Sequence, residues 1–319
     1  MTAAAPTAGP PASGRRPRVG VVTIVAGRHR HLIAHLRALS RSEPRADVHV
    51  VVAMGDREIA DLVDEGGSAR SVVSTLVHVP DDGELPLAEA RNVGAAAAVD
   101  AGCDLVVMLD VDCLVTRSTL AAYVDAHLRV EATAGPGAGP VVLSGPVAYL
   151  PPPRSRSGYP LEGLHLLADP HPARPAPPPG ELVLADDLRL FWSLSFALSA
   201  RDWQRVGGFA TTYRGYGGED TDFGMRLAAA GGRLYWVGGA EAYHQHHPVE
   251  SPPVRHLESV VRNANHFREQ WGWFPMEGWL EGFERLGLAR HDAARDLWVV
   301  TGADGDAVEV DVALDHASQ

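Results

Sequence analysis

The sequence LVVMLDVD, residues 105–112, is an apolar run that ends in two carboxylates, Asp110 and Asp112. Five consecutive apolar residues predict a buried strand over residues 105–109. Carboxylates have no packing reason to follow such a strand directly, so we expect them to contact a ligand. In open α/β sheets, ligands bind beyond the carboxyl ends of the strands, where these two side chains would lie.

The segments around this run predict further strands, which alternate with helices. Strands are expected over residues 19–25, 48–53 and 71–79, and helices over residues 29–39 and 86–101. This alternation is typical of βαβ units and predicts an α/β fold, with a mostly parallel sheet flanked by helices. Residues that follow a strand are candidates for ligand contacts. Those that follow the first two strands are Ala26, Arg28 and Asp56.

Composition divides the chain into five segments. Residues 1–17 are predicted to be a disordered leader, because they are rich in Ala, Pro and Gly and lack an apolar run. Residues 18–150 carry the alternating strands and helices. Residues 151–185 are dense in proline and predict a long loop or an insertion. Residues 186–250 hold the densest cluster of Gly, aromatic and acidic residues, and residues 251–319 predict a helical extension with a tail.

Charge and composition exclude several classes of protein. The formal net charge of −12 argues against binding to nucleic acid. The chain has no lysine, which excludes a Schiff-base lysine and a P-loop lysine. Its two cysteines cannot form a disulfide scaffold and favour a reducing compartment, the cytoplasm. The longest apolar stretch is interrupted by Asp110 and Asp112, so no segment is expected to cross a membrane.

Asp110 and Asp112 are two residues apart, so an extended strand would direct both side chains to one side. Carboxylate oxygens suit Mg²⁺ or Mn²⁺, which usually also bind substrate phosphates. The alternative is a solvated loop after a buried strand, because the D-x-D pattern is common. The apolar run before the pair favours the metal site.

A second candidate site is the sequence GYGGEDTD, residues 215–222. Its glycines, Gly218 among them, allow the backbone to approach a ligand. The acids precede a predicted helix over residues 223–230, where the helix dipole alone would favour them. The functional alternative is that Glu219 or Asp220 acts as a general base beside a sugar-sized pocket. The aromatic walls expected for this pocket are Tyr216 and Trp192.

The third candidate site is the sequence HQHH, residues 244–247. His244 and His246 are two residues apart and would face one side of a strand, as metal ligands or as a surface patch. A zinc hydrolase is a rival interpretation, weakened because no H-E-x-x-H sequence accompanies the histidines. Together with Asp112, one histidine would complete a mixed oxygen and nitrogen site that suits Mn²⁺.

Taken in this order, the segments resemble nucleotide-sugar-dependent glycosyltransferases of the GT-A fold. The N-terminal half resembles the family 2 glycosyltransferases. The second half resembles the C-terminal region of the β-1,4-galactosyltransferases and of the polypeptide N-acetylgalactosaminyltransferases. The resemblance implies a Rossmann-like GT-A domain, with a nucleotide-sugar-binding half at residues 18–150 and a catalytic and acceptor half at residues 186–250. The matching stretches are residues 21–23, 87–95, 110–112, 196–199, 206–209 and 213–222, Arg226-Leu227 and His244.

The resemblance also implies a role for each matched residue. Asp112 and His244 would hold Mn²⁺ or Mg²⁺ with the donor diphosphate. Glu219 and Asp220 match the acidic pair of the galactosyltransferases, in which the aspartate is the base. The retaining N-acetylgalactosaminyltransferases carry Asn at the position of Asp220, so the resemblance implies an inverting mechanism. The residues expected to contact the nucleotide sugar are Thr23, Ala26, Arg28, Asp56, Arg91, Asp110, Val111, Trp192, Tyr216 and Gly218.

The implied activity is metal-dependent transfer of a hexose from a nucleotide sugar, UDP-linked, to an acceptor hydroxyl, in a cytoplasmic, bacterial-type enzyme. A nucleotidyltransferase is a rival, but its Gly-rich, Lys-bearing phosphate loop is missing. A non-catalytic nucleotide- or sugar-binding relative is a second rival, and the four retained side chains Asp110, Asp112, Asp220 and His244 argue against it. The aromatic residues 271–279 either line an acceptor groove or dock a C-terminal helix on the core, and we favour docking.

Overall fold

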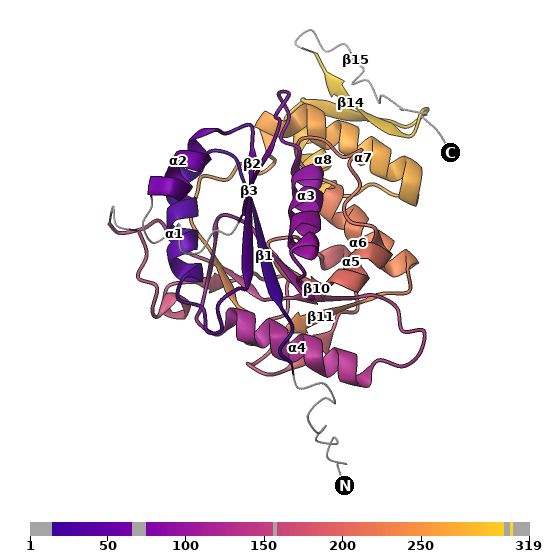
Figure 1. Cartoon of the computed structure of the whole chain (residues 1–319). Helices are drawn as coiled ribbons and strands as arrows, with labels where there is room; N and C mark the ends of the chain where they lie inside the picture. Colours follow the sequence, from indigo (N-terminus) through magenta and orange to yellow (C-terminus); the bar gives the residue numbers. More distant parts are fainter. Residues whose placement is uncertain (1–14, 66–74, 156–157, 303–306, 309–319) are drawn as a thin grey trace.

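The computed structural model describes residues 15–65, 75–155, 158–302 and 307–308 (Figure 1). The predicted leader, residues 1–17, lies almost wholly outside them, as do the first residues of the strand predicted over 71–79. Within the described residues, no helix combines the length and the apolar composition needed to cross a bilayer.

A mixed sheet of eight strands forms the centre of the molecule. The pairs β1–β2, β2–β3, β1–β4 and β6–β11 are parallel, and the other three pairs are antiparallel. The predicted α/β fold with a mostly parallel sheet is therefore confirmed. In order across the sheet, the strands are β3 (Thr75–Val79), β2 (Val48–Met54), β1 (Val19–Val25), β4 (Leu105–Leu109), β10 (Ser195–Ser199), β6 (Val141–Ser144), β11 (Arg233–Val237) and β9 (Leu182–Leu184).

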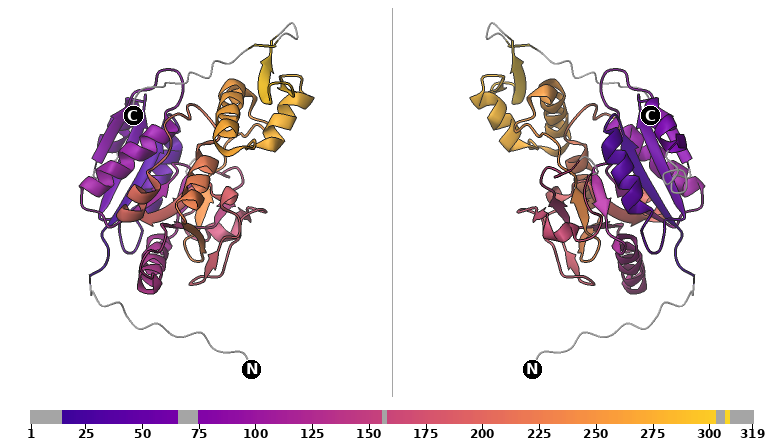
Figure 2. Two further views of the ribbon diagram at one scale, coloured as in Figure 1. Left: turned by 90° about the vertical axis from the view of Figure 1, so that its right-hand side faces the viewer. Right: turned by 90° about the vertical axis from the view of Figure 1, so that its left-hand side faces the viewer.

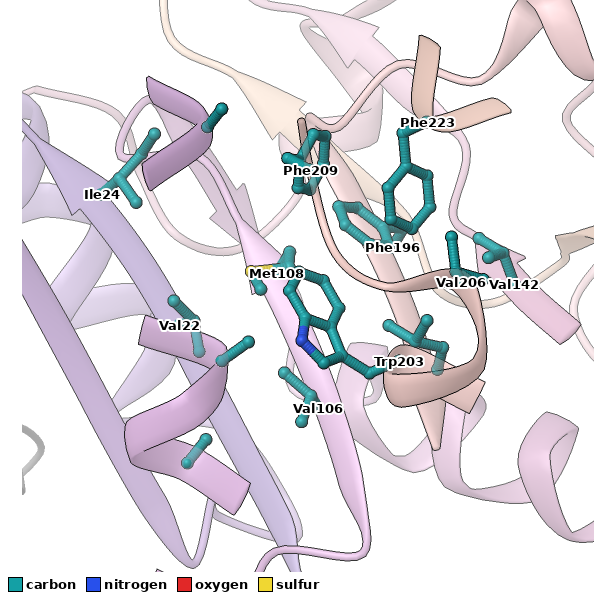
Figure 3. Close-up of a cluster of buried hydrophobic side chains, with 14 of the residues drawn as sticks. Val22, Ile24, Val106, Met108, Val142, Phe196, Trp203, Val206, Phe209 and Phe223 are labelled. Carbon is teal, nitrogen blue, oxygen red and sulfur yellow. The ribbon is translucent and has the colours of Figure 1, made fainter. Parts of the chain in front are cut away.

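Strand β4 is buried on both faces, as its continuous apolar run predicts. Val106 and Met108 point to one face, where Phe196, Trp203, Phe209 and Phe223 also converge (Figure 3). The alternate residues of β4 point to the opposite face and pack against helix α4. The residues on that opposite face are Leu105, Val107 and Leu109.

Helices cover both faces of the sheet (Figure 1). The alanine-rich helix α3 packs closely on β1 and β2. The approach is so close at Gly94 that a Cβ atom there would come within 2.3 Å of Val22. The short helix α2 was not predicted from the sequence. The helices are α1 (His29–Leu39), α2 (Glu58–Glu65), α3 (Leu87–Asp100), α4 (Thr119–Thr133), α5 (Ala200–Val206), α6 (Glu219–Ala229), α7 (Leu257–Trp271) and α8 (Glu277–Arg285), with 3-10 turns η1 (Leu164–Leu166), η2 (Leu188–Leu190) and η3 (Val254–His256).

A second sheet brings two distant candidate sites together. It has four short strands in the order β5 (Cys113–Val115), β12 (Ala242–His244), β7 (Val147–Tyr149) and β8 (Asp169–Pro170). In the β5–β12 ladder, Cys113 lies opposite His244. Because Asp112 directly precedes Cys113, this register carries its carboxylate to the histidine-rich segment.

The C-terminal part stands at one end of the molecule, beyond α6 (Figure 2). Helices α7 and α8 share a separate apolar cluster with a small sheet, in which Val260, Phe283 and Trp298 are buried. Helices α7 and α8 lie in the segment from residue 251 onward, and strands follow them. These strands are β13 (Ala289–Asp292), β14 (Leu297–Thr301) and β15 (Ala307–Val308).

Candidate active site

A cavity of about 1430 Å³ opens where β1 and β4 end and α6 begins. Pockets for one small ligand usually measure roughly 300–1,000 Å³, so this cavity has room for more than one. The three candidate sites of the sequence meet in it. The predicted residues that line it are Ala26, Arg28, Arg91, Asp110, Val111, Asp112, Trp192, Tyr216, Glu219, Asp220 and His244.

Asp112, His244 and His247 form a candidate metal centre. Each offers a ligand atom, and these atoms lie within 4.8 Å of one another. Asp112 Oδ1 is 3.5 Å from His244 Nε2, and Asp112 Oδ2 is 3.6 Å from His247 Nε2. Asp112 Oδ1 is buried and has no hydrogen-bond partner among the described residues, which is unfavourable unless a cation completes the site. One carboxylate with two imidazoles is a mixed oxygen and nitrogen set that suits a divalent transition metal, Mn²⁺ among them.

His246 was predicted as an alternative ligand, and the structure places His247 in the cluster instead. The two-residue alternation that pointed to His246 holds only within a strand, and β12 ends at His244. Beyond it the strand pairing ends, and the side chain of His246 is exposed while His247 Nε2 lies beside Asp112. Burial lowers the pKa of His244, so its imidazole is neutral at pH 7 and free to bind a cation.

The guanidinium of Arg28 places a positive charge beside the candidate metal centre. Its Nη1 atom is 2.6 Å from Asp112 Oδ2, and its backbone has a φ of 49°, which is uncommon for a long side chain. The loop is fixed by Asp56, which accepts hydrogen bonds from Gly27 N and His29 Nε2, both at 2.8 Å. Asp56 was predicted to contact the nucleotide. It does not line the cavity and supports the loop that does.

Arg91 lies at the centre of a second charged cluster. Its guanidinium reaches Glu219 Oε1 at 3.3 Å, Asp110 Oδ1 at 3.5 Å and Asp220 Oδ1 at 3.9 Å. The single buried guanidinium of Arg91 thus lies among three carboxyl groups, which outnumber it. Burial raises the pKa of Asp110 to about 7, and burial together with Asp220 raises the pKa of Glu219 to about 7. The charge of Arg91 opposes both of these shifts.

Two of the acidic residues at the start of α6, Asp220 and Asp222, have different surroundings. Asp220 accepts a hydrogen bond from Ser193 N at 3.1 Å through Oδ2, while Oδ1 has no hydrogen-bond partner among the described residues. Asp222 is fully buried and accepts from Trp271 Nε1 at 2.9 Å and from Tyr213 Oη at 3.4 Å. Asp220 lines the cavity, with its buried Oδ1 facing Arg91, whereas Asp222 joins α6 to α7.

Two predicted contacts are corrected by the structure. Thr23 is fully buried, and its hydroxyl bonds His35 Nε2 at 3.0 Å and His49 Nε2 at 3.1 Å, so it does not reach the cavity. Its side chain points to the face of β1 that helix α1 covers. Alternation along a strand shows which residues share a face, but it does not show which of the two faces lines the cavity. Gly218 does not line the cavity either. It precedes α6 with a φ of 93°, a conformation that favours glycine.

Aromatic side chains form the other walls. Trp192 lies against His171, with ring centroids 4.7 Å apart, and the Arg174 guanidinium lies over its ring. Trp271 and Trp273 contact the core, as the docking interpretation predicts, through Asp222 and Phe267. Trp273 and Trp279 also line the cavity, as the less favoured interpretation of these residues, an acceptor groove, would require.

Residues 186–248 match the family model Glyco_transf_7C, described as the N-terminal domain of galactosyltransferase. Over 283 residues the chain is 29% identical to the validoxylamine A glucosyltransferase of Streptomyces hygroscopicus subsp. limoneus, covering 81% of this chain and 58% of that protein. The chain thus spans less than two thirds of that relative's length.

Two solved structures share the fold. GalNAc-T7 with UDP, GalNAc and Mn²⁺ superposes with a TM-score of 0.54 and 14% identity, covering 86% of this chain and 57% of that one. S. aureus TarS superposes with a TM-score of 0.51 and 14% identity, covering 79% of this chain and 39% of that one. The predicted resemblance is confirmed, and the chain has the fold of the GT-A glycosyltransferases.

Proposed function

We propose that the chain is a metal-dependent glycosyltransferase that moves a hexose from a UDP-sugar to an acceptor hydroxyl, with inversion at the anomeric carbon. The observation that carries this proposal is the meeting of two clusters in one cavity. The cluster of Asp112, His244 and His247 offers a cation site, and Asp220 offers a base beside it. The similarity to a glucosyltransferase and to GalNAc-T7 with UDP supports the choice of donor.

The donor would bind at the cation cluster. Asp112, His244 and His247 would hold Mn²⁺ in preference to Mg²⁺, which favours oxygen ligands, and the bound ion would neutralise the charge that develops on the departing diphosphate. Arg28 adds a fixed positive charge on the same side. These three side chains would supply one carboxylate oxygen and two imidazole nitrogens, and the donor diphosphate would supply further oxygens.

Asp220 would act as the general base. Its Oδ2 is held by Ser193 N, and its carboxylate would accept the proton. As the acceptor oxygen bonds to the anomeric carbon, its proton passes to Asp220, and the bond between that carbon and the diphosphate oxygen breaks with its electron pair. Glu219 and Asp110 hold Arg91, which balances part of the negative charge around the base. Attack from the side opposite the diphosphate inverts the configuration.

We further place the enzyme in the cytoplasm. Both cysteines, Cys103 and Cys113, are buried free thiols, as expected in a reducing compartment.

The proposal is tested by hydrolysis of sugar nucleotides without acceptor. A panel of UDP-, GDP- and dTDP-sugars is incubated with and without Mn²⁺. We expect slow, Mn²⁺-dependent release of UDP from one donor, lost in Asp112→Ala. The matched control is Asp125→Ala, an exposed aspartate on α4 outside the cavity, which keeps the wild-type rate. No release from any donor, together with no nucleotide binding in calorimetry, would contradict the proposal.

A further inference from the structure

Arg174 is a buried arginine to which the proposed reaction assigns no role. It lies in the proline-rich segment 151–185, ahead of the stretch 186–248 that matches the family model. Only 6% of its surface is exposed, and within the described part of the chain it forms no ion pair with a carboxylate. Its Nη2 atom donates to Ser144 Oγ at 2.7 Å, whereas the buried Nε and Nη1 atoms have no hydrogen-bond partner among the described residues. A buried charge without a counterion is unfavourable for folding, so its presence indicates a role outside folding.

The guanidinium of Arg174 holds Trp192 against the core. Its Cζ atom lies 5.5 Å from the ring centroid of Trp192 and 4.9 Å from that of Trp236. Trp236 is buried on β11, so the arginine links Trp192 to a strand of the large sheet. His171 contacts the Trp192 ring edge-on at 4.7 Å, and its carbonyl accepts a hydrogen bond from Arg174 N at 3.3 Å. A short stretch of the proline-rich segment, 171–174, thus supplies two contacts that fix the indole.

Trp192 connects this arrangement to Asp220. Ser193 follows Trp192 in the chain, and its backbone N–H donates to Asp220 Oδ2 at 3.1 Å. Trp192, Ser193 and Asp220 line the cavity, whereas Arg174 does not. Any effect of Arg174 on the reaction therefore passes through the indole and the Ser193 peptide. A shift of the indole would carry the Ser193 N–H with it and release the carboxylate.

We propose that Arg174 is a positioning residue for the base: by cation–π attraction it holds Trp192 beside Trp236, and thereby keeps the Ser193 N–H on Asp220. This inference rests on the proposed function and deepens it. A guanidinium suits this role because its planar face packs on an indole while an N–H at its edge bonds to a neighbour, here Ser144. The attraction is stronger when both groups are removed from water, as they are here. An apolar side chain of similar length would fill the space without this attraction.

The test measures Mn²⁺-dependent hydrolysis of UDP-glucose, UDP-galactose and UDP-N-acetylglucosamine by Arg174→Met. In hydrolysis a water oxygen bonds to the anomeric carbon, its proton passes to Asp220, and the diphosphate leaves with the electron pair of the broken bond. We expect kcat to fall by about 10–100-fold, because a misplacement of about 1 Å can cost a factor of about 10². The donor KM and the UDP dissociation constant should stay within about twofold of wild type, because the cation cluster is unchanged.

The matched control is Arg129→Met. Arg129 on α4 donates to Gly180 O at 2.6 Å and so anchors the same proline-rich segment, but it lies outside the cavity. Its loss should leave kcat unchanged, which separates the effect of Arg174 from a general loosening of the segment. Arg174→Lys keeps the positive charge without the planar fork and should give a kcat between those of wild type and Arg174→Met. Urea denaturation shows which variants are folded, and Arg174→Lys carries the test if Arg174→Met does not fold.

The decisive comparison combines Arg174→Met with Asp220→Asn. If Arg174 acts through Asp220, Arg174→Met lowers kcat in the wild-type background but changes it by less than about twofold in the Asp220→Asn background. Losses that multiply in the double variant would overturn the proposal. A kcat within about twofold of wild type in both Arg174 variants, or an equal loss in Arg129→Met, would also overturn it. If wild type itself releases no UDP, the proposed function fails, and that result is distinct from a failure of Arg174 alone.

Discussion

The two walls of the cavity differ in origin and in chemistry. The charged wall is built where strands end, from side chains such as Asp110, Asp112 and His244 that the β4, β5 and β12 ladders fix. The aromatic wall is built by a segment that follows the matched family region, and its side chains are more exposed. The comparison teaches that one cavity combines side chains fixed by strand ladders with side chains from a separate C-terminal unit. Substitutions on the two walls should therefore alter different constants.

The largest effect is expected on the charged wall, in Asp220→Asn. The amide keeps the shape of the side chain but cannot accept the acceptor proton. Transfer should fall by about 10²–10⁴-fold, while UDP affinity in the presence of Mn²⁺ stays at the wild-type value. Transfer rates and calorimetry on the same sample measure both quantities. Near-normal turnover in Asp220→Asn would exclude this residue as the base.

The next effect separates two neighbouring histidines. His247→Ala removes a cation ligand and should weaken Mn²⁺ binding by at least the roughly 10–100-fold that losing an outer-shell partner costs. His246→Ala removes an exposed imidazole outside the cluster and should leave the Mn²⁺ dissociation constant unchanged. Mn²⁺ titration of both variants decides the matter. Equal losses would show that the cluster is not the cation site.

These histidines show where the sequence was informative and where it was not. Continuous apolar runs predicted β1, β2 and β4, because a buried strand needs no periodicity to be recognised. The rule that ligands bind beyond the carboxyl ends of strands then singled out Asp110, Asp112 and Arg28, and all three line the cavity. His247 was missed because the strand pattern was extended beyond the end of β12, where hydrogen bonding no longer imposes it.

Other features depend on packing that no local pattern encodes. Thr23 lies on β1 as predicted, yet its side chain points to buried histidines and away from the cavity. Arg91 was expected at the nucleotide, and its simultaneous contact with three carboxylates from β4 and α6 appears only in the fold. The aromatic wall needs α8 to reach Tyr216, a contact between segments about 60 residues apart.

A smaller effect distinguishes structural from catalytic acids within one helix. Asp222→Ala removes the acceptor of the Trp271 and Tyr213 hydrogen bonds between α6 and α7. The free energy of unfolding should fall by about 1–3 kcal/mol, because a buried donor loses its partner. Urea denaturation measures the loss, and kcat of the folded enzyme should change little. A loss of kcat comparable to that of Asp220→Asn would show that Asp222 is not merely structural.

The last effect is a dependence of stability on pH. Burial, with Asp220 close by, raises the pKa of Glu219 from 4.5 to about 7, against the opposing attraction of Arg91. Between these values the folded state binds more protons than the unfolded state, so this group destabilises the fold as pH rises from about 4.5 to about 7. The metal-free protein should lose less stability over this range as Glu219→Gln than as wild type. Identical slopes in urea denaturation would contradict the shift.

The most direct measurement is calorimetry of UDP binding with and without Mn²⁺, in wild type, Asp112→Ala and Trp279→Ala. If the charged wall holds the cation and the donor, UDP binding requires Mn²⁺, is lost in Asp112→Ala and keeps its wild-type affinity in Trp279→Ala. UDP binding that persists in Asp112→Ala, or that is lost in Trp279→Ala, would contradict the division of the cavity into two walls.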